Sequence, residues 1–169
     1  KKAALLVASL ASFLTPFMGS SVNIALPTIG SAFNCNAIIL SWIATSYILA
    51  SAVFLLPFGR IADIIGRKKI FLRGIILFSL ASVLSGLAWS VTSLIIFRVF
   101  QAIGSSMIFG TGVAIITSIF PARERGKALG ISVSAVYTGL ALGPFVGGFL
   151  TEHLGWRSVF FFAVPPGIL

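Results

Sequence analysis

Arg98 and Gln101 are the side chains of this sequence whose types and spacing could do chemistry inside an apolar segment. Together with Ala102 and Ser105 they fall at i, i+3, i+4 and i+7, so a helix places all four on one face. If that helix starts near Thr92, Arg98 lies about 9 Å along it and Gln101 lies one turn deeper. An arginine at that depth could extend its side chain to the membrane surface and reach water there. Gln101, one turn deeper, could not do so as easily. A wet cavity explains both residues, and a guanidinium without a neighbouring carboxylate favours an anion there.

Other reactive residue types are too sparse to form a site. Cys35 and His153 are the only cysteine and the only histidine of the chain. Neither a disulfide within the chain, nor a metal site, nor a nucleophile with a base can be assembled from them. The sequence therefore predicts a protein that is not an enzyme, with no cofactor and no metal.

The composition predicts that membrane-spanning helices position the polar residues. The chain has 169 residues, of which 58% are hydrophobic and 9% charged, against about 25% charged in soluble domains. A span needs about 20 apolar residues and must be helical in lipid. We expect an all-α, polytopic six-helix transmembrane bundle over residues 1–169. Its spans are expected at 3–29, 38–58, 70–89, 92–119, 127–151 and 158–169, the last of them truncated.

Basic residues indicate how the bundle is oriented. The net charge is +9, and ten of the twelve basic residues lie at the amino terminus or in the 59–73 and 120–127 connections. Arg157 is the one fixed cation in the remaining connections. Because cytoplasmic loops of membrane proteins are rich in Lys and Arg, we expect a cytoplasmic amino terminus. The charge is thus explained by topology, and nucleic acid is not an expected partner.

One connection combines glycines with an unusual density of charge. It contains Gly59, Asp63, Gly66 and Arg67, followed by two lysines, between two apolar runs. The spacing predicts a tight cationic hairpin that joins two membrane helices.

Small and polar residues form a stripe on the first expected helix. Ser12, Thr15, Gly19, Asn23 and Pro27 recur at spacings of three and four. Such residues face either a neighbouring helix, which they allow to approach closely, or a water-filled cavity. Both interpretations stay open, and Asn23 is the member that we expect to reach a cavity.

Glycines form a groove on the fifth expected helix. Gly139, Gly143 and Gly147 are four residues apart, with Pro144 beside the middle one and Gly148 after the last. Stacked glycines let another helix enter closely, and the proline removes a backbone donor. We expect helix packing here, with a bend near Pro144.

Five segments together resemble the major facilitator superfamily of secondary transporters. The 59–68 segment matches its loop between spans two and three, Arg98-x-x-Gln101-x-x-Gly104 resembles its span-four motif, and residues 139–148 resemble the span-five motif of antiporters. Residues 155–167 and 22–27, with 42–49, are similar to the branch of drug:proton antiporters with 14 spans.

The resemblance implies the first six-helix half of a transporter, built from 3+3 inverted repeats, with alternating access around a midplane site. Expected partners are a small-molecule substrate, protons, the lipid bilayer of the plasma or inner membrane, and a missing C-terminal transmembrane half. The residues expected to work are Arg98, Gln101, Asn23, Trp42 and Tyr47 in the cavity, Gly59, Asp63, Gly66 and Arg67 in a conformational latch, and Gly139, Gly143, Pro144, Gly147 and Gly148 in an outer gate.

One departure keeps alternatives open. Met18 stands where the branch usually has an aspartate, and the three acids, Asp63, Glu124 and Glu152, all lie at or near span ends. We expect a proton-coupled exporter of small lipophilic molecules. A facilitator or exporter of an anionic metabolite, and a receptor on the same scaffold that does not transport, are the alternatives.

Overall fold

The chain folds into helices throughout the part that the structure describes. The computed structural model describes residues 2–164, with side chains from residue 5 onward. Its elements are α1 (Lys2–Phe33), α2 (Ala37–Ile65), α3 (Arg67–Gly86), α4 (Val91–Ile119), α5 (Ala122–Leu154) and α6 (Arg157–Phe162). The all-α prediction is confirmed.

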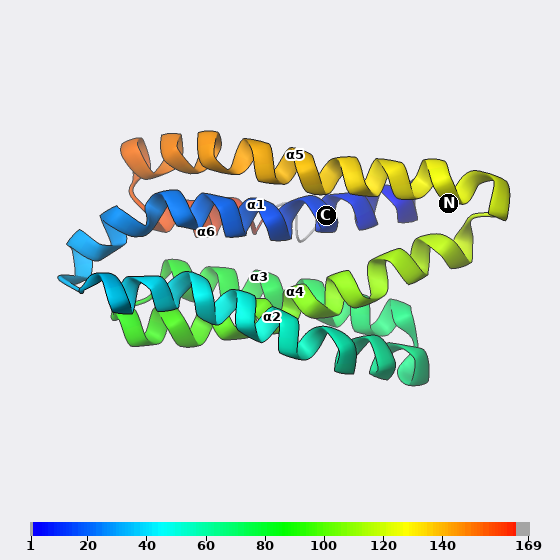
Figure 1. The fold of residues 1–169 in the computed structure, drawn as a ribbon, viewed down its shortest axis with the longest axis horizontal. Helices are drawn as coiled ribbons and strands as arrows, with labels where there is room; N and C mark the ends of the chain where they lie inside the picture. Colours follow the sequence, from blue (N-terminus) through cyan, green and yellow to red (C-terminus); the bar gives the residue numbers. More distant parts are fainter. Residues whose placement is uncertain (1, 165–169) are drawn as a thin grey trace.

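The helices form two groups that lie side by side (Figure 1). Helix α1 packs along α5 with α6 beside them, and α4 packs along both α2 and α3. Contacts of α1 with α4 and of α3 with α6 join the groups. If helices one to three are exchanged with helices four to six, the pair α1–α5 becomes the pair α4–α2. Both pairs are in contact. This pattern fits two repeats of three helices.

Helices α1 to α5 are each long and apolar enough to cross a membrane. Large apolar side chains such as Leu56, Ile64 and Phe145 are 81%, 78% and 77% exposed, which is the expected state of a lipid-facing surface. The predicted sixth span begins with α6, and residues 165–169 of that span lie outside the described residues.

The joint between α2 and α3 is much shorter than the predicted 59–73 connection. Helix α2 continues to Ile65 and α3 begins at Arg67, so Gly66 alone separates them. Its φ of 113° lies in a region that favours glycine. The prediction was wrong because a charged segment was equated with a loop, although Lys and Arg are good helix formers. For the same reason Arg123, Arg125 and Lys127 lie in α5.

Glycines bring α3 and α4 into close contact. A Cβ atom at Gly104 would lie 2.6 Å from the Phe78 nitrogen, and one at Gly74 would lie 2.7 Å from the Met107 Cβ. The two backbones therefore lie closer together than a side chain at either position would permit. This contact sets the distance between polar residues of α3 and those of α4.

Candidate functional site

A cavity of about 680 Å³ is lined by residues of α1, α2 and α4 and by Leu140 of α5. That volume is within the usual range of small-molecule sites. Most of the lining is apolar. The polar residues that line it are Thr15, Ser20, Asn23, Tyr47, Ser51, Arg98, Ser105 and Ser106.

Arg98 is the charged residue of this lining, and its side chain is held from several directions. It is 1% exposed. Its Nη1 donates to Gln101 Oε1 at 2.6 Å, and its Nε donates to the Ile43 carbonyl at 3.4 Å. The guanidinium carbon lies 4.1 Å from the centre of the Tyr47 ring. Nη2 has no acceptor among the residues whose side chains the structure describes, and Arg98 belongs to the cavity lining.

Gln101 lies behind Arg98 and does not line the cavity. It is fully buried, and its Nε2 donates to Ser82 Oγ on α3 at 2.7 Å. Ser82 in turn donates to the Phe78 carbonyl at 2.7 Å. The hydrogen bond between Arg98 and Gln101 is consistent with the prediction that these two residues act together. Ser82 was not identified from the sequence, where it is one serine among several in its run.

Two hydroxyls of the lining are buried without a hydrogen-bond partner among the described residues. They belong to Thr15 and Ser51. A buried hydroxyl without a partner costs free energy, on the order of 1–3 kcal/mol. These groups could recover it by bonding a ligand.

Other residues of the predicted cavity set lie in different surroundings. Asn23 lines the cavity, and its contact with a substrate stays a prediction. Trp42 is 49% exposed and lies outside the lining. The stripe on α1 is divided, since Ser12 shares a hydrogen bond of 3.2 Å with Ser132 of α5, whereas Thr15 and Gly19 face the cavity.

The cavity lining contains no acidic residue. Met18, at the position where an aspartate was expected from the resemblance, is fully buried in the apolar core. Asp63, Glu124 and Glu152 are all exposed. Within the described residues the cavity therefore offers donors and apolar surface to a ligand, and it offers no carboxylate to a cation.

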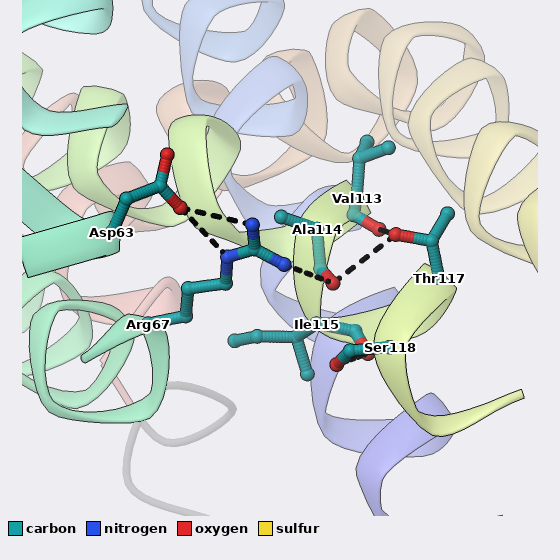
Figure 2. Close-up of polar contacts among 7 residues, drawn as sticks. All are labelled: Asp63, Arg67, Val113, Ala114, Ile115, Thr117 and Ser118. Atoms are coloured by element: carbon teal, nitrogen blue, oxygen red, sulfur yellow. Dashed lines mark hydrogen bonds and ion pairs between the residues drawn. The ribbon is translucent and has the colours of Figure 1, made fainter. Parts of the chain in front are cut away.

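Two of the predicted latch residues, Asp63 and Arg67, meet at the corner between α2 and α3 (Figure 2), while Gly59 lies within α2 and Gly66 separates the two helices. Asp63 Oδ1 accepts from Arg67 Nε at 2.9 Å and lies 2.9 Å from Arg67 Nη2. The third nitrogen, Nη1, donates to the Ala114 carbonyl of α4 at 3.2 Å, an oxygen that also accepts from the Thr117 hydroxyl. The ion pair thus ties the corner to α4.

The glycines of the predicted gate pack directly on α1. A Cβ atom at Gly139 would run into the Phe13 carbonyl oxygen, and one at Gly147 would lie 2.7 Å from the Ser21 Cβ. The Ser21 hydroxyl donates to the Gly143 carbonyl at 2.9 Å. Pro144 is exposed and lies inside the unbroken helix α5. Close helix packing is therefore observed, and the gating role stays a prediction.

Comparison with known proteins identifies relatives over nearly the whole chain. The family described as Major Facilitator Superfamily matches residues 8–169. The riboflavin transporter RibZ of Clostridioides difficile is 36% identical over 98% of this chain and 36% of its own length. The cephamycin export protein CmcT of Amycolatopsis lactamdurans is 40% identical over 98% of this chain and 34% of its own. The multidrug resistance protein Stp of Mycobacterium tuberculosis is 38% identical over 88% of this chain and 28% of its own. The chain thus spans about a third of the length of these relatives.

Solved structures show the same arrangement of helices. A bacterial homolog of the human lysosomal transporter Spinster, in an inward-facing and occupied conformation, superposes with a TM-score of 0.86 at 26% identity, over 99% of this chain and 42% of that one. The proton:xylose symporter XylE superposes with a TM-score of 0.85 over 98% of this chain and 42% of its own, at 19% identity. At that identity the likeness to XylE concerns the fold alone.

Proposed function

The chain belongs to the Major Facilitator Superfamily, and we propose that the complete protein exports small lipophilic molecules in exchange for protons. Members of the family are multi-pass membrane transporters, and the chain is accordingly part of a transporter and not of an enzyme. Relatives named as multidrug resistance and export proteins support the direction of transport and the lipophilic substrate.

The cavity around Arg98 carries the proposal. It has the size of a small-molecule site, its walls are mostly apolar, and the buried Arg98 is part of its lining. In our proposal this six-helix bundle is the amino-terminal half, and substrate binds between it and a second bundle near the membrane midplane. Arg98, Tyr47 and Asn23 contact the substrate, while Gln101 supports Arg98.

Transport by the complete protein in proteoliposomes tests this proposal. With an imposed pH gradient, the purified protein should drive uptake of the lipophilic dye Hoechst 33342 into vesicles, and collapse of the gradient with nigericin should abolish it. Uptake that ignores the gradient would indicate a facilitator. Binding of the dye without uptake would indicate a receptor on this scaffold.

An exporter or facilitator of an anionic metabolite is the second candidate. The observation in its favour is a buried guanidinium in a lining without any acidic residue, which attracts an anion more than a cation. A proton gradient need not drive such an exporter. Transport of a radiolabelled aromatic carboxylate that is equal at pH 6 and pH 8 would favour this candidate.

We further propose that the protein lies in the plasma or inner membrane with its amino terminus in the cytoplasm. The distribution of basic residues supports this orientation. Lys68→Cys and His153→Cys lie at exposed positions of α3 and of the carboxyl end of α5. A membrane-impermeant maleimide added to intact cells should label position 153 and leave position 68 unlabelled; the reverse pattern would invert the topology.

A further inference from the structure

We infer that Ser82 of α3 is a positioning residue that fixes the direction of the Arg98 guanidinium through Gln101. The inference rests on the proposed transport function for its consequence, although its geometry stands alone. Ser82 is fully buried, lies on a different helix from Arg98 and does not line the cavity. It is connected to the cavity by two hydrogen bonds in series, each of 2.7 Å or less.

The hydrogen bonds in this series can run in only one direction. Arginine has donors and no acceptor, so the atom of Gln101 that faces Arg98 must be Oε1. The amide nitrogen Nε2 then faces α3 and needs an acceptor. Ser82 has a single hydroxyl proton, which it donates to the Phe78 carbonyl at 2.7 Å. Its oxygen is therefore left to accept from Nε2, and both ends demand the same orientation of the Gln101 amide.

This series supports Arg98 through two residues that do not line the cavity. Gln101 holds Nη1, the Ile43 carbonyl accepts from Nε, and the Tyr47 ring lies against the guanidinium. Without the Ser82 oxygen, Nε2 in its present orientation would be a buried donor that has lost its acceptor. The amide would rotate toward another partner and move Oε1 away from Nη1. The guanidinium of Arg98, which lines the cavity, would then lose its fixed direction toward a substrate oxygen.

Helix α3 supplies a matched control. Ser85 is one turn further along the same helix, is also fully buried, and has a hydroxyl without a partner among the described residues. Replacing Ser82 or Ser85 by alanine removes the same atom from a similarly buried place. Only the first change removes the acceptor of Gln101.

The first experiment measures Arg98 without any substrate. The complete protein is labelled with ¹⁵N-arginine and studied in detergent by NMR, and the Arg98 Nε–H signal is assigned from its loss in Arg98→Lys. Ser82→Ala should shift this signal and accelerate its hydrogen exchange several-fold. Ser82→Thr, which keeps the hydroxyl, and Ser85→Ala should leave it near the wild-type position. An unchanged signal in Ser82→Ala would overturn the inference.

The second experiment measures selectivity in proteoliposomes with two radiolabelled probes that share one ring system. 2-Naphthoate offers oxygen acceptors, whereas 2-naphthylmethylammonium offers none. Ser82→Ala should lower the flux ratio of naphthoate to naphthylmethylammonium by about 2- to 12-fold, the effect of one uncharged hydrogen bond. In a Gln101→Met background, Ser82→Ala should have no further effect, since a residue that acts through Gln101 is not additive with it.

The two experiments separate the two proposals. If the wild-type protein carries no flux but Ser82→Ala shifts the Arg98 signal, the transport function fails and the positioning role stands. If wild-type flux is present and Ser82→Ala matches Ser85→Ala in both experiments, the positioning role fails and the transport function stands. If Ser82→Ala lowers the flux ratio equally in the wild-type and Gln101→Met backgrounds, the positioning role fails as well.

Discussion

Arg67 and Arg98 are both held by several partners, but Arg67 lies near water and Arg98 is buried. Arg67 has a side chain that is 41% exposed, and its partner is the carboxylate of Asp63. Arg98 is 1% exposed, and it is held by an amide, a carbonyl and an aromatic ring without any carboxylate. The first is a neutral pair near water, and the second is a buried cation that no acid compensates.

The two arginines differ in how much they contribute to the stability of the fold. An exposed ion pair contributes about 0–1 kcal/mol, so the Arg67 pair is a modest local tie between two helix ends and α4. Burying a guanidinium without a counter-ion costs several kcal/mol before its hydrogen bonds are counted. Arg98 therefore contributes little to the stability of the fold. A charged residue that is buried in a membrane bundle at such a cost indicates a ligand site or an ion pathway.

The largest expected effect sets these two arginines against each other. Arg98→Met keeps the length of the side chain and removes its donors, so transport of an acceptor-bearing substrate should fall by about 10- to 150-fold, the worth of a charge-assisted hydrogen bond. The thermal unfolding midpoint should not fall, because a buried charge has been removed. Arg67→Met breaks an exposed ion pair, so it should lower the free energy of unfolding by less than about 1 kcal/mol. Flux assays and scanning calorimetry on both variants check this, and wild-type flux in Arg98→Met would break the comparison.

A second prediction adds a region whose role is packing. Gly147 and Gly148 are neighbours on α5, but a Cβ atom at Gly147 would lie 2.8 Å from the Ser21 Cα, whereas one at Gly148 would meet only Ile24 Cγ2 at 3.7 Å. Gly147→Ala should therefore lower the free energy of unfolding by about 1–3 kcal/mol, and Gly148→Ala should leave it nearly unchanged. Denaturation of both variants in detergent provides the measurement.

The same pair tests the predicted outer gate. If the contact of α5 with α1 forms only when the outer side is closed, Gly147→Ala should also increase maleimide labelling of a cysteine introduced at Asn23, which lines the cavity. Lower stability with unchanged labelling would restrict Gly147 to packing.

The sequence predicted what depends on hydrophobicity and on helical spacing. The six helical segments, the shared face of Arg98 and Gln101, and the glycine groove all follow from composition and from intervals of three and four. Family resemblance added that the six helices form one bundle built from 3+3 inverted repeats. These features are local to one helix or set by the bilayer, so no knowledge of tertiary contacts was needed.

The remaining features depend on which helix faces which. Nothing in the run around Ser82 distinguishes it from Ser79 or Ser85, and only the close approach of α3 to α4 at Gly74 and Gly104 makes it the partner of Gln101. The one-residue joint at Gly66 was missed because charge marks the end of the lipid-embedded segment and not the end of the helix. In both cases geometry between helices decides, and spacing along one helix does not report it.

The smallest expected effect on stability concerns Asp63, and it decides whether the exposed ion pair has a role beyond its own corner. Asp63→Asn keeps the shape of the side chain and removes its charge, while the bond from Arg67 to the Ala114 carbonyl stays possible. The free energy of unfolding should fall by less than about 1 kcal/mol, as expected for an exposed pair. If the corner braces this bundle against a second one, transport should nevertheless fall clearly, with substrate affinity in detergent within a few-fold of wild type. Glu124→Gln, a change at an exposed acid in the first turn of α5, is the control and should leave flux unchanged. Wild-type flux in Asp63→Asn would reduce the pair to local solvation, and Arg98 would then stand alone as the arginine on which transport depends.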